Sequence, residues 1–424
     1  MAILIKNGRV VDPANKIDDI QDILIEQSKI ARVSKGIKTQ AGEIIDAAGR
    51  LVMPGIVDMH VHLREPGRED KETILTGTSA ALRGGVTSCL AMPNTQPAID
   101  CPGNVRLVKD IITKTAKANV FIAGAITKGR QGQEITDINS LKNEGVLAIT
   151  DDGSSVDCDE LLLEVFKIAK ANKVLVICHS EDTLLTRGGV VNLGLISTCM
   201  GLRGIAKESE YKRVQRDIQL AKRASAPVHI AHISCSESVE IIAEAKREGI
   251  EVTAETAPHY FSLTEEQALG YDTNMKINPP LRSKGDVAAI RQGLQDGTID
   301  VIASDHAPHT ENEKDIEFEH AAFGTTGLET ELSVGITELV QTDILGWTDL
   351  VSKLTTNPAR ILGLDKGDLS IGKDADIIII DPTQEWVVSK DNFLSKSKNC
   401  AFLGSKLNGV VEYTICNGKI AYKK

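Results

Sequence analysis

The sequence predicts an α/β protein: a (β/α)8 barrel of the TIM type, with a small β-sandwich module formed from its N- and C-terminal segments. Two observations lead to this prediction. In the middle of the chain, eight short runs with strand character alternate with stretches of helical periodicity. At both ends, short apolar runs are separated by turn signals instead of helices. A doubly wound open sheet is the alternative for the middle of the chain.

The terminal strands are expected in AILIKNG, DILIEQSKIARV and EIIDAAGRLVMPG, which Asn-Gly, Gln-Ser and Gly interrupt. The C-terminal end repeats this style in DADIIIIDP and VVEYTICNGKIAYKK. We expect the two ends to pair, although they are far apart in the sequence. Residues 1–54 and 365–424 would then form the module, and residues 55–364 the barrel.

The barrel strands follow in order, most of them with a helical stretch such as DELLLEVFKIAKAN or SVEIIAEAKREG after them. Alternating βα units imply a parallel sheet, and eight units are the number that closes a barrel. The glycine-rich segment 184–206 is expected to be either a mobile loop over the site or an insertion. The expected strands are 56–63, 86–94, 120–127, 146–152, 173–180, 227–234, 251–258 and 300–308.

Composition excludes several classes of protein. The net charge of the 424 residues is −11 and no Lys/Arg cluster occurs, so no nucleic-acid partner is expected. The eight cysteines are scattered without a C-x-x-C pair, which is typical of reduced, cytoplasmic proteins. The N-terminus MAILIKNGRV lacks the apolar core of a signal peptide, and no apolar run is long enough to cross a membrane. We therefore expect a cytoplasmic enzyme without a membrane partner.

Imidazoles and carboxylates fall at the carboxyl ends of the expected strands, where barrels carry their chemistry. In DMHVHLREPG, His60 and His62 would point to the same face of a strand. A single histidine in such a place is more often a packing residue, and a single aspartate more often caps a helix. Several at one rim instead indicate a metal site. The further polar residues at these ends are Asn94, Asp151, Asp152, His179, His232, Asp305, His306 and His309.

Nitrogen and carboxylate ligands without a thiolate suit zinc. One catalytic zinc normally takes three protein ligands. Four histidines and two aspartates, six ligands in all, therefore fit two ions that share a bridging carboxylate. Asp152 is the candidate for the bridge, although periodicity does not separate it from Asp151. His232 is favoured over His229 because it lies at the strand end and the two face opposite sides. One or two zinc ions per chain are expected.

The motifs DMHVHLREPG, AMPNTQP, TDDG, ICHSED, HIAHIS, KINPPLRS and ASDHAPH resemble, in order and spacing, the dihydroorotase family of the amidohydrolase superfamily. The resemblance implies that a metal-activated water opens or closes a cyclic amide. It further implies that His60 and His62 bind one metal, His179 and His232 the other, Asp152 both, and that Asp305 binds the first metal and shuttles the proton. His62, Arg64, Asn94, Asn278 and His309 would bind the substrate, and Phe323 and Gly324 would contact the pyrimidine ring through backbone groups.

The implied reaction is the reversible cyclisation of N-carbamoyl-L-aspartate to dihydroorotate in de novo pyrimidine biosynthesis. Many relatives in the superfamily bridge their metals with a carbamylated lysine after strand 4, but GVLAITDDG has no lysine there. This departure argues against a hydantoinase, dihydropyrimidinase or allantoinase. The alternatives are another cyclic amidase and a non-catalytic partner of aspartate transcarbamoylase. A complex with that enzyme and a homo-oligomer are both compatible with the resemblance.

Overall fold

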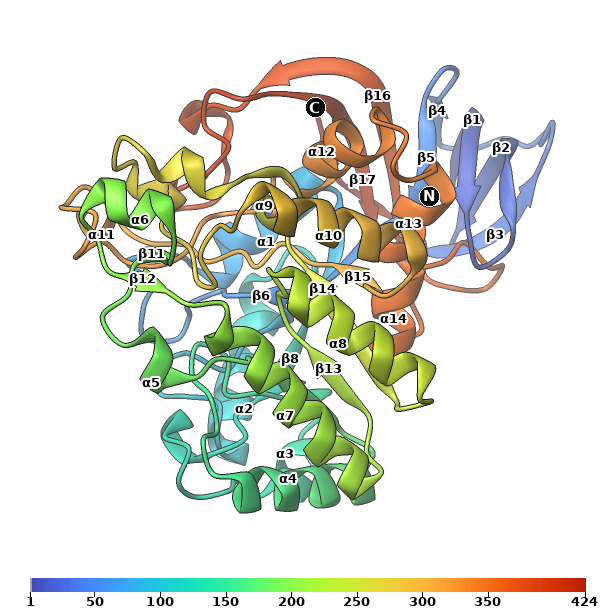
Figure 1. The fold of residues 1–424 in the computed structure, drawn as a ribbon. Helices are drawn as coiled ribbons and strands as arrows, with labels where there is room; N and C mark the ends of the chain where they lie inside the picture. Colours follow the sequence, from blue (N-terminus) through green and yellow to red (C-terminus); the bar gives the residue numbers. More distant parts are fainter. Residues whose placement is uncertain (1) are drawn as a thin grey trace.

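The computed structural model describes residues 2–424, and its body is a parallel sheet of eight strands curled into a barrel (Figure 1). Neighbouring strands follow the order of the chain, from β6 to β15. The first and last strands meet at a parallel bridge between Val61 and His306, where the His62 N–H donates to the His306 carbonyl at 2.9 Å. The barrel strands are β6 (Ile56–Val61), β7 (Val86–Ala91), β8 (Asn119–Gly124), β9 (Ala148–Ile149), β10 (Leu175–Cys178), β13 (Val228–Ile230), β14 (Val252–Thr256) and β15 (Val301–Ile302).

Helices cover the outside of the barrel because each presents one apolar face to it. In α4, for example, Leu162, Val165 and Phe166 are buried, whereas Asp159 and Glu160 open the helix at its positive end. The longer helices are α1 (Ile74–Gly84), α2 (Pro102–Thr115), α3 (Ile138–Asn143), α4 (Asp159–Asn172), α7 (Glu208–Ala224), α8 (Ser236–Arg247), α10 (Lys284–Asp296), α13 (Trp347–Leu354) and α14 (Thr356–Leu362). Short helices are α5 (Thr183–Thr186), α6 (Leu195–Met200), α9 (Pro258–Ser262), α11 (Glu311–Lys314) and α12 (Glu331–Gly335), and single turns are η1 (Lys128–Arg130), η2 (Glu265–Ala268), η3 (Thr273–Met275), η4 (Ile336–Val340) and η5 (Lys390–Asn392).

The barrel predicted from the sequence is confirmed, but its strands are shorter than predicted. The expected strand 146–152 is reduced to β9 and the expected strand 300–308 to β15. Side chains replace the ladder bonds at the rim: the Ile126 N–H donates to Asp151 Oδ1 at 2.8 Å, and the Asp152 N–H donates to Thr150 Oγ1 at 3.0 Å. Asp152 and Asp305 therefore lie on loops that begin where β9 and β15 stop.

The two ends of the chain pair with each other, as predicted, and together they form one mixed sheet (Figure 1). Ile377 pairs with Pro54 across the antiparallel junction of β16 and β5, and this junction joins the N-terminal half of the sheet to the C-terminal half. The predicted turn at Asn417 and Gly418 has φ of 49° and 72°, the left-handed conformation that Asn-Gly hairpin turns require. The strands are β1 (Ile3–Asp12), β2 (Ile17–Glu26), β3 (Lys29–Ser34), β4 (Glu43–Asp46), β5 (Leu51–Pro54), β16 (Ile377–Val387), β17 (Lys406–Cys416) and β18 (Lys419–Lys423).

This sheet has an apolar core of its own, with Ile5, Ile23, Val52 and Ile377 fully buried. We therefore propose the division into a module of residues 1–54 and 365–424 and a barrel of residues 55–364. The connection 388–405 between β16 and β17 leaves the module and crosses to the barrel rim. There Asn399 Oδ1 accepts the His309 N–H at 3.0 Å.

The segment 184–206 is a folded insertion. It contains α5, α6 and a two-stranded parallel sheet of β11 (Val191–Asn192) and β12 (Gly204–Ile205). Its Val190 and Met200 share an apolar cluster with Phe318.

Among residues 2–424, no helix combines the length and the apolar character that crossing a membrane requires.

Candidate metal centre and substrate pocket

The six residues predicted as metal ligands meet at the mouth of the barrel, around the carboxylate of Asp152. Asp152 Oδ1 lies 3.3 Å from His60 Nε2, 3.4 Å from His179 Nδ1 and 3.4 Å from His232 Nε2. Asp152 Oδ2 instead lies 3.4 Å from His62 Nε2. The sixth residue, Asp305, places Oδ1 3.3 Å from His62 Nε2 and 3.6 Å from His60 Nε2.

The donor set fits a divalent cation. His60 Nε2 and Asp152 Oδ1 are buried and have no hydrogen-bond partner among residues 2–424. Nδ1 of His179 and Nε2 of His232 lie 2.8 Å apart, and each lies 3.4 Å from Asp152 Oδ1. Two groups of three ligand atoms are close enough to hold an ion: His60, Asp152 and His232, and His60, His62 and Asp305. Imidazole nitrogen and carboxylate oxygen are the ligands that catalytic zinc sites use.

An outer layer of polar groups orients the histidine rings. Glu255 Oε1 lies 2.6 Å from His60 Nδ1, Glu181 Oε2 2.8 Å from His179 Nε2, and Asn94 Oδ1 2.9 Å from His62 Nδ1. Each of these three rings is therefore held at one nitrogen and turned toward Asp152 with the other, as in known histidine metal sites. Sequence reasoning missed Glu255 and Glu181; the signal for Glu255 was a single carboxylate within an otherwise strand-like run, EVTAETAP.

Burial alone would raise the pKa values of the acidic residues, yet their histidine neighbours reverse the effect. His60, His179 and His232 hold the pKa of Asp152 well below its ordinary value. The histidines around Asp305 likewise lower the pKa of that carboxyl. Both aspartates are therefore ionised at neutral pH and carry the negative charge that a cation needs.

Three residues of the site have backbones in the left-handed region, which side chains other than glycine rarely adopt. The φ angles are 62° for Arg64, 34° for His232 and 45° for Asp305. Each such conformation costs about 1–3 kcal/mol and is concentrated at functional sites in proteins.

Periodicity did not separate Asp151 from Asp152, and it only favoured His232 over His229. The contacts of these residues decide both choices. His232 lies in the cluster, whereas His229 places Nδ1 2.8 Å from Thr253 Oγ1 and Nε2 3.2 Å from Glu255. Asp151 faces away from the cluster and accepts the Thr127 N–H at 3.0 Å. His62 and the other cluster residues lie just past their strands, and only His60 lies within one; the expectation that His62 belongs to the strand is wrong.

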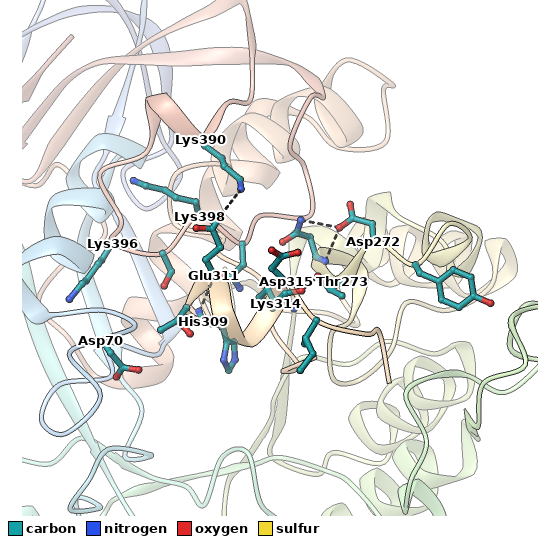
Figure 2. A pocket seen from close by; sticks show the side chains of 16 residues that line it. Asp70, Asp272, Thr273, His309, Glu311, Lys314, Asp315, Lys390, Lys396 and Lys398 are labelled. Carbon is teal, nitrogen blue, oxygen red and sulfur yellow. Dashed lines mark hydrogen bonds and ion pairs between the residues drawn. The ribbon is translucent and has the colours of Figure 1, made fainter. Parts of the chain in front are cut away.

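The predicted substrate residues line the rim beside this cluster. Arg64 Nη2 lies 3.4 Å from His309 Nε2, and Asn278 Nδ2 donates to Glu181 at 3.1 Å. Burial lowers the pKa of Arg64 to about 10, so the guanidinium stays charged at neutral pH. Figure 2 shows the neighbouring cavity of about 720 Å³, which His309, Lys314 and Asn399 line.

Gly324 closes this wall of the site. Its N–H donates to the Lys276 carbonyl at 2.9 Å, and its carbonyl accepts from Lys314 Nζ at 3.0 Å and Asn399 Nδ2 at 3.1 Å. Its φ is 135°, and a Cβ there would lie 2.8 Å from that of Ala307. Both the N–H and the carbonyl group of Gly324 are thus bonded within the protein. Its main contribution to the site is therefore the space left by its missing side chain.

Comparison with known proteins identifies the family. A family described as "Dihydro-orotase-like" matches residues 49–238, and one described as "Amidohydrolase family" matches residues 227–422. Proteins named dihydroorotase are similar over the full length. The one from Elusimicrobium minutum is 52% identical and covers 99% of this chain and 97% of its own, and the one from Geotalea daltonii is 49% identical and covers 100% of both.

Among solved structures, the L-hydantoinase (dihydropyrimidinase) from Arthrobacter aurescens has a TM-score of 0.90 at 26% identity, with 100% of this chain and 96% of that chain covered. A D-hydantoinase has a TM-score of 0.87 at 26% identity, with 99% and 95% covered. The shared backbone shows the amidohydrolase barrel, and the much higher sequence identity decides the branch: the chain belongs to the dihydroorotase family.

Proposed function

We propose that this enzyme is a zinc-dependent dihydroorotase, which catalyses the reversible cyclisation of N-carbamoyl-L-aspartate to (S)-dihydroorotate in pyrimidine biosynthesis. The observation that carries the proposal is the position of Asp152, whose two oxygens face different histidines at the centre of the site. An aspartate thus occupies the place where hydantoinase-like relatives are expected to use a carbamylated lysine. The full-length similarity to proteins named dihydroorotase supports the same reading.

His60, His62 and Asp305 would hold one zinc ion, His179 and His232 a second, and Asp152 would contact both. A bound zinc ion lowers the pKa of water and polarises a carbonyl group. The protein's own part is to present these ligands without rearrangement, since Glu255, Glu181 and Asn94 already fix the rings. Metal analysis per chain decides between one and two ions.

Asp305 would move the proton. In the hydrolytic direction a base must take a proton from the attacking water and deliver it to the departing ring nitrogen. Asp305 is ionised and lies 3.3 Å from His62 Nε2, so it reaches both the metal position and the space above it. Replacing it by asparagine keeps the shape but removes the base.

A protein with a net charge of −11 needs a local positive group to bind an anionic substrate. Arg64 supplies it, because a guanidinium can bind a carboxylate with two parallel hydrogen bonds. Asn94, Asn278 and His309 would complete the carboxylate site, and the main chain of Phe323 would contact the ring.

Activity assays with the zinc-loaded chain test the proposal. We expect turnover of dihydroorotate and carbamoyl aspartate, little turnover of hydantoin or allantoin, and a loss of about 10²–10⁴-fold in kcat for Asp305→Asn with its metal retained. Absence of turnover in both directions, with metal bound, would contradict the proposal. If the inactive chain also co-purified with aspartate transcarbamoylase, a scaffold role would be supported instead.

Two further proposals concern partners and location. A complex with aspartate transcarbamoylase, or with a second copy of this chain, is tested by light scattering of the chain alone and of the mixture. A cytoplasmic location is supported by the eight unpaired cysteines, five of which are buried. Fractionation of cells that produce the natural protein tests the location.

A further inference from the structure

Lys71 is a buried lysine beside the site that the mechanism above does not use. It follows the arginine motif in HLREPGREDK and is 6% exposed. Its Nζ lies 3.1 Å from Nδ1 of His309 and 2.8 Å from Oε1 of Glu313. A lysine thus contacts a proposed substrate-binding histidine at the ring nitrogen opposite the one that faces Arg64.

This contact determines where the His309 ring carries its proton. Burial lowers the pKa of Lys71, and the ion pair with Glu313 at 2.8 Å opposes this effect. As the ammonium of this ion pair, Lys71 has three donors and no acceptor. Nδ1 of His309 must therefore offer a lone pair, and the neutral ring then carries its hydrogen on Nε2. Burial, together with the charges of Arg64 and Lys71, lowers the pKa of His309 to about 2, which agrees with a neutral ring.

The other charged groups around the ring do not offer a better partner. Glu313 Oε2 lies 3.4 Å from Nδ1, farther than Lys71, and it already accepts the Thr310 N–H at 3.0 Å and the Thr310 hydroxyl at 3.1 Å. Lys314 is bonded to the carbonyl groups of Ala322 and Gly324.

On the substrate side, two donors then face each other. Nε2–H of His309 lies 3.4 Å from Nη2 of Arg64, and two donors cannot bond to one another. Among residues 2–424, no oxygen acceptor lies within hydrogen-bond distance of either nitrogen. Two convergent donors without an acceptor fit the oxygens of a carboxylate.

We propose that Lys71 is a positioning residue: it fixes the Nε2–H form of His309 and thereby reserves His309 and Arg64 for the carboxylate of the substrate. The role assigned to the carboxylate rests on the proposed function. Without Lys71 the ring could carry its hydrogen on Nδ1, donate it to Glu313, and accept a hydrogen bond from Arg64 through Nε2. The two substrate-binding groups would then satisfy each other, and the anion would have to separate them.

Nuclear magnetic resonance tests the tautomer directly. Long-range ¹H–¹⁵N spectra of the zinc-loaded wild type, with His309 assigned by its loss in His309→Gln, should show a neutral ring protonated at Nε2. Lys71→Met should shift the ring toward the Nδ1–H form, and Lys71→Arg should keep the wild-type form because arginine is also a donor without an acceptor. A wild-type ring protonated at Nδ1 or at both nitrogens would overturn the inference, as would an unchanged tautomer in Lys71→Met. If Lys71→Met does not fold, the wild type and Lys71→Arg still decide.

Kinetics give the second readout. Lys71→Met should raise KM for carbamoyl aspartate by about 10- to 100-fold, with kcat changed much less, because the loss is in binding the carboxylate. Lys71→Arg should restore most of the affinity. Lys390→Met is the matched control: this lysine lines the cavity that His309 also lines, its side chain is 57% exposed, and it lies 3.7 Å from Glu311.

An equal fall in kcat for both methionine variants, with KM unchanged, would argue against positioning. An inactive wild type would contradict the proposed function alone, since the spectra still decide the tautomer.

Discussion

At the scale of single residues, the site is built from pairs of contacts on opposite sides of each ring. His60 faces Asp152 with Nε2 and Glu255 with Nδ1, and His309 faces Arg64 with Nε2 and Lys71 with Nδ1. The outer partner decides which ring nitrogen has a free lone pair: a carboxylate accepts a hydrogen bond from the ring, and an ammonium donates one to it. A histidine would thereby serve as a metal ligand at position 60 and as a hydrogen-bond donor to an anion at position 309, as we propose.

Glu255→Gln tests, at the metal centre, whether the outer partner of a histidine ring determines how well the ring binds metal. The carboxylate lies 2.6 Å from His60 Nδ1, and its loss should make the ring a weaker ligand. We expect zinc affinity to fall by about 10- to 100-fold, measured by competition with a chromogenic chelator. Glu251→Gln, an exposed position just before the same strand, should bind zinc like the wild type. Equal affinity in all three proteins would show that Glu255 does not support the ligand.

The residues of the site differ in how far sequence could predict them. His60, His62 and Asp305 stand in compact motifs, so the strand-end rule and the family resemblance both reach them. Glu255 and Lys71 contact partners far along the chain: Glu255 and His60 are 195 positions apart, and Lys71 and His309 are 238 positions apart. Periodicity describes which face a side chain occupies, but it does not show which distant side chain lies opposite.

At the scale of elements, the order and number of the barrel strands were predictable, whereas their ends were not. Alternating βα runs determine the topology, but the last residues of a strand are decided by competition between ladder bonds and side-chain bonds. In the predicted strand 146–152, Asp151 binds the main chain of the neighbouring loop and stops the strand early. The same polar residues that mark the site thus shorten the strands that carry it.

Asp286 links the starts of three helices, and its removal tests how they are held. It is 1% exposed, forms a capping box with Ser283 at the start of α10, accepts the Ser236 N–H at 3.1 Å and lies 2.6 Å from Lys207 Nζ. Burial raises its pKa, but the bonds to Lys207 and Ser283 outweigh burial and hold the pKa below its ordinary value. We expect Asp286→Asn to lower the free energy of unfolding by about 2 kcal/mol at pH 7 in urea titrations.

The sign of the pH dependence follows from the lowered pKa. A carboxyl with a depressed pKa in the folded state stabilises the protein fully above its unfolded pKa, and this stabilisation is lost as pH falls through the folded pKa. The difference between wild type and Asp286→Asn should therefore stay constant from pH 7 to about 5 and shrink progressively as the pH falls further. Glu244→Gln, an exposed position on α8, serves as control. A difference that grows on acidification would contradict this account.

At the scale of the whole molecule, the chain ends are joined to the chemistry by the connection 388–405. Ser397 Oγ donates to the Lys71 carbonyl at 2.6 Å, and Asn399 contacts His309 and Gly324. The terminal module therefore contributes to the wall of the proposed substrate pocket, although its sheet lies beside the barrel (Figure 1). The pairing of the two ends was predictable from their strand character, but the reach of this connection was not, because it contains no periodic pattern.

Metal removal tests how the centre and the fold depend on each other. The barrel shares a large apolar core with residues of the terminal module, so we expect the zinc-free chain to remain folded, with its far-ultraviolet circular dichroism unchanged. The unpartnered His60 Nε2 and Asp152 Oδ1 should nevertheless make zinc binding stabilising, by about 2.7 kcal/mol when free zinc is 100 times the dissociation constant. The melting temperature should accordingly rise with the logarithm of free zinc, and rise less with magnesium, which prefers oxygen ligands.

His60→Ala removes one ligand of both groups and should abolish most of the rise. A zinc-free chain that is unfolded would instead show that the centre is needed to build the barrel, and equal stabilisation of His60→Ala would show that zinc binds elsewhere.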